Sequence, residues 1–380
     1  MAQHRKAIII GGGPAGLSTA LRLQQTTDIK CTIYELRPEP TTLGGAIGIM
    51  PNGLRLLHRL GILGEQEDIV SYASAHTGFG YMRIKRTGLV DVLLNAVYKA
   101  HIPVYFNKRL TAIDDNEKSG VTVTFSDGTT DTADLLIGCD GIHSYVRQVY
   151  VDPDQAPEYS GFSGLFALVP SSDLPASAAA QTSGLNVTLN EQGMFMATLA
   201  TAAGDEMFWG LSQQVPLPGT GDSRDGWEVH RQKEVEGLKS NVRQILEDFY
   251  PVYRLPLGGV WYKGRCVILG DAVHAMQPHA GQCASMALED CFLLARLLKD
   301  ATNPLTEVYK RFEEIRRPRV NEIYSLSVQN GEIRKKTGPW GLWAKELAIG
   351  MTFWVYWVLR LEKWGRGQRH LVYDIDEEDL

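Results

Sequence analysis

The sequence predicts an α/β fold in which a parallel-sheet βαβ unit comes first, a largely antiparallel sheet forms the middle, and helices fill the C-terminal part. Three observations predict this order. A short apolar strand at Ala7–Ile10 runs directly into a glycine-rich turn and a helix-spaced apolar segment from Leu17 to Gln25. Residues from about 153 to 260 are rich in Gly, Ser, Thr and aromatic residues with strand-like patterns. Beyond Ala284 the periodicity is mostly helical.

A second strand, Lys30–Tyr34, completes the first βαβ unit and ends at Glu35. Gly11, Gly13 and Gly16 form a GxGxxG pattern between strand and helix, and Glu35 follows the last glycine by nineteen positions. The first glycine permits a tight turn, the second lets the backbone approach a pyrophosphate, and the third allows close packing of helix on strand. The helix N-terminus attracts phosphate charge, and the carboxylate suits a ribose hydroxyl pair. This unit is therefore predicted to bind a dinucleotide.

The other regular elements are predicted from periodicity and turn residues. Helices are expected at Pro51–Leu60, Leu63–Ser71, Thr87–Ala100 and Ala284–Leu298, and from Leu305 past Arg317. Pro318 is expected to kink or restart that last helix, because proline lacks the N–H that a helix interior needs. Strands are expected at Tyr81–Ile84, Val104–Phe106, Leu110–Ile113, Val121–Phe125, Leu135–Ile137, Gly164–Val169, Leu185–Leu189, Met194–Leu199, Met207–Leu211 and Cys266–Leu269.

Composition excludes several classes of protein. The 380 residues are 44% hydrophobic and 22% charged, which is typical of a folded globular chain with room for two to three domains. A net charge of -6 argues against nucleic-acid binding. Five cysteines show no CxxC pair and no paired spacing, which argues against a disulfide framework or a structural zinc site. With an N-terminal apolar run too short for a signal peptide, we expect a cytoplasmic protein.

Two further motifs accompany the first. In one, the strand Leu135–Ile137 leads to Asp140, Gly141 and Arg147; in the other, the strand Cys266–Leu269 leads to a loop and a helix. The key residues of that third motif are Gly270, Asp271, His274, Pro278, Gly281, Gln282, Cys283 and Ala284. At these three motifs the chain resembles the single-component FAD-dependent aromatic hydroxylases, the group A flavoprotein monooxygenases. That family includes para-hydroxybenzoate hydroxylase, salicylate hydroxylase and the tetracycline-inactivating monooxygenases. The resemblance covers about residues 6 to 325, in the family's order and approximate spacing.

The resemblance implies a Rossmann-type FAD-binding domain with a discontinuous antiparallel-sheet substrate domain and C-terminal helices. The FAD-binding domain is expected at residues 1–72, 86–152 and 262–300. The substrate domain is expected at residues 73–85 and 153–261, and the C-terminal helical region at residues 301–380.

The resemblance also implies which residues hold the cofactor. Glu35 corresponds to the residue that binds the adenosine ribose, and Arg37 to one near the adenosine or its phosphates. The first motif contributes Gly11, Gly13, Pro14, Ala15 and Gly16.

A second group of implied contacts lies nearer the flavin. Arg86 opens an Arg-x-x-Leu helix and matches a family arginine close to the flavin. Asp271 matches an aspartate at the ribityl and pyrophosphate region, while Asp140, Gly141 and Arg147 match the motif shared between FAD and NADPH handling.

The loop of the third motif suits a flavin on physical grounds. Reduced flavin is anionic around N1 and O2, and a helix beginning after Gly281 would present free N–H groups there. Pro278, stiff and without an N–H, suits a loop lying flat against the ring. Gly270, Gln282, Cys283 and Ala284 complete the expected contacts. The family usually has Gly-x-Gly where this chain has Gly281-Gln282-Cys283, so the thiol either tunes or bonds the cofactor or points into the helix packing.

The activity implied by the resemblance is a monooxygenase reaction. NADPH, or NADH, would visit transiently and reduce FAD, and O2 would then give a C4a-hydroperoxyflavin that inserts one oxygen atom into an aromatic or polycyclic small molecule. We expect the substrate between the middle sheet and the flavin, near Met194, Phe195 and Trp209, and we assign no catalytic base. A flavin-dependent epoxidase or Baeyer–Villiger-type oxygenase, or a non-catalytic FAD-containing binding protein, remain open alternatives.

Three histidines, His143, His274 and His279, raise the question of a metal. No His-x-x-x-His pair on a predicted helix and no carboxylate cluster accompanies them, so no metal site is predicted. His274 is expected near the flavin, where it supports the loop.

The C-terminal segment Leu347–Leu359 is apolar or aromatic apart from Thr352. Its thirteen residues are fewer than the ~18–20 that span a bilayer. We expect a helix that packs on the flavin or substrate domain and closes the site. Weak membrane association through this segment stays open, because the basic residues Arg334, Lys335 and Lys336 precede it.

Overall fold

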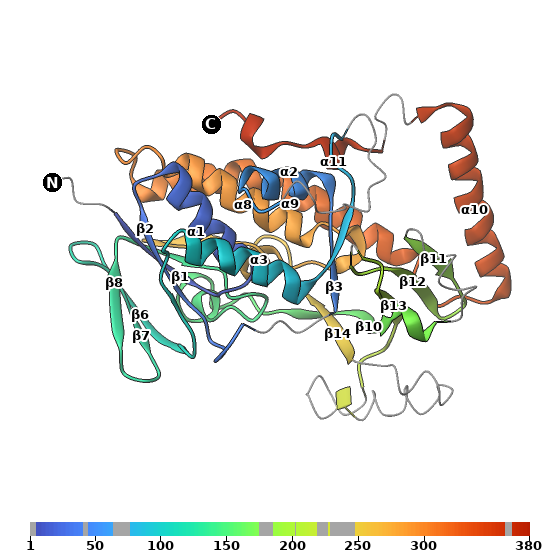
Figure 1. Cartoon of the computed structure of the whole chain (residues 1–380), viewed down its shortest axis with the longest axis horizontal. Coiled ribbons are helices and arrows are strands. Elements are labelled where there is room, and N and C mark those ends of the chain that lie inside the picture. Colours follow the sequence, from blue (N-terminus) through green and yellow to red (C-terminus); the bar gives the residue numbers. More distant parts are fainter. Residues whose placement is uncertain are drawn as a thin grey trace.

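The computed structural model of the chain describes residues 5–40, 45–63, 77–174, 185–201, 203–218, 227–228, 248–361 and 367–380. It confirms the predicted fold class: a Rossmann-like α/β domain, a separate antiparallel sheet and C-terminal helices (Figure 1). The helices are α1 Pro14–Thr26, α2 Pro51–Arg59, α3 Arg86–Lys99, α7 Asp271–His274, α8 Cys283–Leu297, α9 Leu305–Glu332, α10 Pro339–Val358 and α11 Arg369–Val372.

The Rossmann-like domain is built on a six-stranded sheet with the order β15-β16-β9-β1-β2-β5. All neighbouring pairs run parallel except the edge pair β15 and β16. The strands are β1 Lys6–Ile10, β2 Lys30–Tyr34, β5 Val104–Tyr105, β9 Leu135–Gly138, β15 Tyr262–Lys263 and β16 Cys266–Ile268. Because β16, β9 and β1 are neighbours, the three motif loops that follow them emerge side by side at one edge of the sheet.

The middle of the chain forms a five-stranded antiparallel sheet with the order β11-β12-β13-β10-β14. Its strands are β10 Glu158–Pro170, β11 Asn186–Leu189, β12 Gly193–Leu199, β13 Glu206–Gln214 and β14 Asp248–Arg254. The sheet stands apart from the six-stranded sheet, at the right of the view in Figure 1.

Two small sheets complete the strands. β3 Ala46–Ile49 pairs with β4 Met82–Lys85, and β6 Leu110–Asn116, β7 Gly120–Phe125 and β8 Thr130–Ala133 form a three-stranded sheet. The β3–β4 pair touches the five-stranded sheet, because the guanidinium of Arg83 on β4 lies over the ring of Phe208 on β13. Residues 82–85 of the expected substrate domain thus pair with β3 and not with the five-stranded sheet.

Helices α1, α3, α8 and α9 pack with the six-stranded sheet into one large apolar core. α9 continues from Leu305 to Glu332 through Pro318, so the expectation that this proline restarts the helix is wrong. Pro318 costs the helix one backbone hydrogen bond, but apolar side chains are buried on both sides of the proline. Phe312 before it and Ile323 after it are completely buried.

α10 does not pack as expected. None of its twenty residues is buried, and Figure 1 shows the helix at the edge of the molecule beside β11 and β12. Its apolar side chains therefore close no site in this structure. Among the described residues, no helix combines the length and the hydrophobicity needed to cross a membrane.

The sequence patterns did not predict the strands β3, β8, β14 and β15 or the short helices α7 and α11. They also missed the π-helical turn Arg147–Val151 that follows the second motif. Most of the helix predicted at Leu63–Ser71 lies outside the described residues.

Candidate active site

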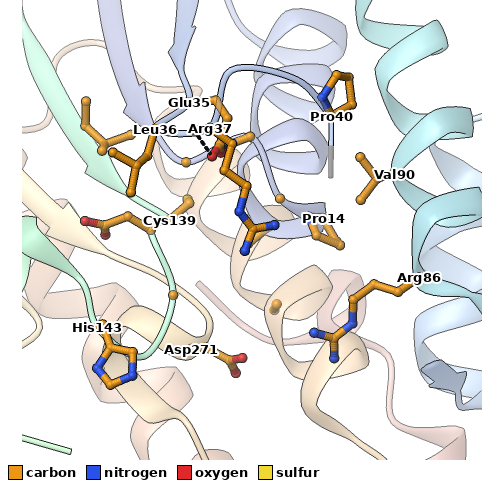
Figure 2. Close-up of a pocket in the computed structure, with 18 of the residues that line it drawn as sticks. Pro14, Glu35, Leu36, Arg37, Pro40, Arg86, Val90, Cys139, His143 and Asp271 are labelled. Atoms are coloured by element: carbon orange, nitrogen blue, oxygen red, sulfur yellow. Dashed lines mark hydrogen bonds between the residues drawn. The ribbon is translucent and has the colours of Figure 1, made fainter. Parts of the chain in front are cut away.

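A cavity of about 440 Å³ opens at the edge where β1, β9 and β16 end, and it brings together residues from all three motifs (Figure 2). The predicted site residues that line it are Gly11, Gly13, Pro14, Ala15, Glu35, Arg37, Arg86, Asp140, Gly141, Asp271, Cys283 and Ala284. The predicted residues that are absent from its lining are Gly16, Arg147, Gly270, His274, Pro278, Gly281 and Gln282.

The glycine turn after β1 leaves a cradle for a bulky anion. Gly11 adopts a φ of 110°, and a Cβ there would lie 2.3 Å from the Cys139 carbonyl oxygen, so only glycine fits. A Cβ on Gly16 would lie 2.0 Å from the Gly11 carbonyl oxygen, because helix and strand are in close contact. Gly13 differs from both, since its Cβ position meets no protein atom within 4 Å and faces the cavity.

The N-terminus of α1 carries a positive electrostatic end that favours a phosphate group. Its N-cap, Gly13, has no side-chain hydrogen bond to the helix, Pro14 occupies the first turn, and no acidic residue lies in that turn. The backbone N–H groups of the first turn are thus directed to the cavity end of the helix, where the dipole favours negative charge. These features fit the pyrophosphate of a dinucleotide.

Glu35 is fixed at the end of β2 by two backbone donors. The N–H of Gly12 donates to Oε2 at 2.6 Å, and the N–H of Arg37 donates to Oε1 at 2.9 Å. The carboxylate still has lone pairs for ribose hydroxyls. Figure 2 shows Arg37 and Arg86 extending into the cavity from opposite walls, with Asp271 below them.

In the second motif, Asp140 organises its own turn. Its carboxylate accepts hydrogen bonds from Ser144 Oγ at 2.5 Å and from the N–H of Tyr145 at 2.7 Å. Gly141 follows with a φ of 79° and open space at its Cβ position. The backbone at this turn can therefore approach a ligand closely.

Arg147 is the member of the second motif that does not line the cavity. It is completely buried, and its guanidinium donates to the carbonyl oxygens of Ala272 and Ile142, each at 2.6 Å. Its position joins the turn of the second motif to α7 in the third. Arg147 thus supports the cavity wall from behind and lines no part of the cavity.

In the third motif, only Asp271 and the start of α8 reach the cavity. His274 is buried, and its Nε2 lies 2.7 Å from Asp290 Oδ2, so it supports the loop from inside. Pro278 is exposed, Gly281 has a φ of 65°, and the buried Gln282 accepts from Asn52 Nδ2 at 3.0 Å.

Cys283 is the first residue of α8, and it lines the cavity. Its Sγ lies 3.8 Å from the Met276 carbonyl oxygen. Burial raises the pKa of the Cys283 thiol to about 12, so the group stays protonated and weakly nucleophilic at neutral pH.

Several cavity residues escaped the sequence analysis. Phe106 and Lys108 line the cavity from the connection between β5 and β6, and Leu110 from the start of β6. His143 and Cys139 lie on either side of Asp140 in the sequence and also line the cavity. The backbone N–H of Lys108 donates to the Glu35 carbonyl oxygen at 2.8 Å, which ties this connection to the ribose side of the site. No local sequence motif identifies Phe106, Lys108 and Leu110, because they reach the cavity only through the pairing of β5 with β2. The described part of the chain contains no group of three His, Cys, Asp or Glu side chains placed to hold a metal.

The fold and the cavity define a flavoprotein of the nucleotide-binding α/β class. Residues 82–327 match the family described as FAD binding domain, and residues 9–55 match an NAD(P)-binding Rossmann-like domain. The first match spans more than half of the chain, and the chain belongs to this family, that of the group A FAD-dependent aromatic hydroxylases.

Curated relatives cover nearly the whole chain. A 6-hydroxynicotinate 3-monooxygenase of Pseudomonas fluorescens is 26% identical, over 89% of this chain and 94% of its own. A salicylate hydroxylase of Pseudomonas putida is 28% identical, over 87% of this chain and 86% of its own. The chain is accordingly an FAD-dependent monooxygenase with FAD as its cofactor, and the match to the NAD(P)-binding domain supports NAD(P)H as co-substrate.

Solved structures agree with this assignment. The Klebsiella pneumoniae protein HpxO, in complex with FAD and uric acid, is 26% identical with a TM-score of 0.70 and covers 87% of this chain and 88% of its own. The tetracycline destructase Tet(55) shares the fold at 21% identity, with a TM-score of 0.71 over 92% of this chain and 96% of its own.

Proposed function

We propose that this monooxygenase uses NADPH, with NADH as the alternative donor, to insert one oxygen atom into a small aromatic or heteroaromatic compound that carries a hydroxyl or carboxylate group. The observation that carries the proposal is the single cavity that unites the Gly11–Ala15 turn, Glu35, Arg86 and Asp271. The substrates named for relatives, hydroxynicotinate, salicylate and urate, support a planar, oxygen-bearing ring.

The chain's own residues provide binding and orientation. The first turn of α1 holds the pyrophosphate, Glu35 holds the ribose, and Asp271 lies at the ribityl chain. Bound FAD supplies the redox chemistry that activates O2 after reduction by the nicotinamide. The α8 N-terminus at Cys283 carries no acidic residue in its first turn, so it stabilises negative charge on the ring.

The nicotinamide donor has no separate domain in this proposal. The NAD(P)-binding match falls on residues 9–55, which include the turn and helix assigned here to the ADP half of FAD. The sequence has one GxGxxG between strand and helix. NADPH therefore visits the flavin transiently.

We place the substrate against one face of the five-stranded sheet, here called the inner face. The inner face is the one whose side chains point toward the β3–β4 pair and His279, and it carries Gly164, Phe166, Met194, Met196, Phe208, Gly210 and Ser212. Antiparallel partners share a face, and successive residues alternate. Of the residues expected near the substrate, Met194 lies on the inner face, whereas Phe195 and Trp209 lie on the other, with their rings 5.9 Å apart.

Arg83 on β4 supplies a cation at the inner face. Its guanidinium lies 4.3 Å from the centre of the Phe208 ring, and Nη1 donates to Tyr81 Oη at 2.9 Å. Within the described residues no carboxylate pairs with it, and its buried Nε has no acceptor. We assign Arg83 as the counter-ion of an anionic substrate, because an unpaired guanidinium gains most from a carboxylate or phenolate.

The experiment that tests the function is a visible spectrum of the purified protein. It is recorded before and after NADPH is added without oxygen, with 6-hydroxynicotinate, salicylate and urate as effectors, and again after air is admitted. Bleaching that an aromatic effector accelerates, recovery in air and a hydroxylated product by mass spectrometry would support the proposal. Flavin that neither NADPH nor NADH reduces with any effector would overturn it.

A further inference from the structure

α10 presents an unusually apolar surface to solvent. Trp340 is 84% exposed, Phe353 70% and Trp357 73%, and Trp343, Met351 and Trp354 are also exposed. Monomeric proteins rarely leave so many large apolar side chains together on one element, so such a surface indicates a binding partner.

The helix is held at a defined orientation. Lys345, on the side that faces the protein, donates through Nζ to the carbonyl oxygens of Lys335 at 2.8 Å and Ile333 at 3.2 Å. Just before the helix, the N–H of Thr337 donates to the Glu191 carbonyl oxygen in the turn between β11 and β12. The N-terminal half of α10 is therefore held beside the five-stranded sheet, with the exposed side chains directed away from it (Figure 1).

The sequence around α10 is positively charged, whereas the chain as a whole is negatively charged. Between Arg334 and Arg369 the sequence has eight Lys and Arg residues against two Glu, whereas the chain as a whole has a net charge of -6. Lys336 before the helix, and Arg360 and Arg369 after it, are exposed. Positive charge at both ends of an apolar, tryptophan-rich helix complements an anionic lipid surface, where tryptophan rings lie at the level of the headgroups.

A second copy of the chain is a poorer partner for this surface. In a parallel pair of α10 helices, Lys336 would face Lys336 and Arg360 would face Arg360. In an antiparallel pair, Lys336 would face Arg360, so that both arrangements bring like charges together. Glu346 is the one acidic residue of α10 that could compensate.

We propose that α10 docks the enzyme on the surface of an anionic membrane. The exposed tryptophan and phenylalanine rings enter the headgroup region, the basic residues at both ends contact lipid phosphates, and the helix lies in the plane of the interface without crossing it. Lys345 holds α10 on the protein side, so the membrane contact uses only the opposite, exposed side of the helix.

The test is co-sedimentation of the full-length, FAD-loaded protein with vesicles. One set contains equal amounts of phosphatidylcholine and phosphatidylglycerol, and the other contains phosphatidylcholine alone. We expect binding to the anionic set, weaker binding to the neutral set, and release at about 1 M NaCl, where the Debye length is about 3 Å. The double variant Trp354→Gln/Trp357→Gln should bind at least about tenfold more weakly.

The matched control is Leu217→Gln/Leu257→Gln, which replaces two exposed apolar residues far from α10 in the sequence and should bind as wild type. Retained flavin absorbance shows that each variant is folded. Absence of binding to both vesicle sets, or equal binding by the tryptophan variant, would overturn the proposal. So would light scattering that shows a dimer dispersed by the tryptophan substitutions, without vesicle binding. The assay involves no turnover, so its outcome is independent of the proposed reaction.

Discussion

Asp290 on α8 accepts a hydrogen bond from Nε of Arg316 on α9 at 2.8 Å, and both side chains are completely shielded from solvent. The other carboxylate oxygen of Asp290 accepts from the N–H of Gly270 at 2.9 Å and lies 2.7 Å from His274 Nε2. Burial alone would raise the pKa of Asp290, but His274 and Arg316 hold it below its usual value. This ion pair therefore connects the long helix α9 to the turn that places Asp271 in the cavity.

Replacing Asp290 by Asn should destabilise the protein by about 3–5 kcal/mol, because the buried Arg316 charge loses one of its two carboxylate partners and keeps only Glu289. The Gly270 turn should loosen as well, and FAD affinity should fall. Urea unfolding and flavin titration measure the two effects. The control is Glu313→Gln, which removes a partly exposed pair with Arg317 and should cost less than about 1 kcal/mol. Equal losses in both variants would contradict the role assigned to Asp290.

Gly13→Ala and Gly16→Ala should separate cofactor binding from folding. A Cβ added at Gly13 meets no protein atom and the φ of −80° suits alanine, so the variant should keep its unfolding free energy. That methyl group would occupy space assigned to the pyrophosphate, and FAD affinity should fall at least about tenfold, or about 1.4 kcal/mol. Gly16→Ala forces a backbone clash and should instead lower stability. Unchanged FAD affinity in Gly13→Ala would place the cofactor elsewhere.

Arg83→Gln should raise KM for an anionic aromatic substrate about tenfold or more, since a charge-assisted contact contributes about 1.5–3 kcal/mol. A neutral analogue of the same substrate should be affected little. Arg83→Lys keeps the charge and should recover part of the loss, although it forfeits the planar contact with Phe208. Steady-state kinetics with both substrates supplies the measurement, and equal effects on the two would refute a counter-ion role.

His279 should make stability depend on pH. Burial, and next the Arg334 charge, lower its pKa from 6.5 to about 3 in the folded state. Between those two values the unfolded chain takes up a proton and the folded chain does not, so stability falls as the pH falls below about 6.5. From pH 7 to pH 5 this amounts to about 2 kcal/mol.

His279→Gln should remove the part of the pH dependence of the unfolding free energy that comes from His279. Urea unfolding at pH 7 and pH 5 measures this difference. The same difference between pH 7 and pH 5 in wild type and variant would exclude His279 as its source. Because Nε2 of His279 lies 3.4 Å from Ser212 Oγ, a small loss of stability at pH 7 is also expected.

The part of the cavity lined by Gly11, Gly13 and Glu35 could be predicted from the sequence because its determinants are local. Gly11, Gly13 and Glu35 belong to one strand–helix–strand unit, and their roles depend on spacing within about 25 residues. The contacts of Arg147 could not be predicted in this way. The motif fixes the position of Arg147 in the sequence, but its guanidinium donates to the carbonyl oxygens of Ala272 and Ile142, and only folding brings Ala272 close to it.

The sequence by itself determined the family, the α/β class, the order of the elements and the glycine-turn part of the cavity wall, because glycine turns and apolar periodicity are properties of short segments. Only the tertiary structure decided which residues face the same space. Strand register placed Met194 and Trp209 on opposite faces of the sheet, α9 continued through Pro318, and no residue of α10 became buried. Register and burial depend on pairings between distant segments, which no local pattern records.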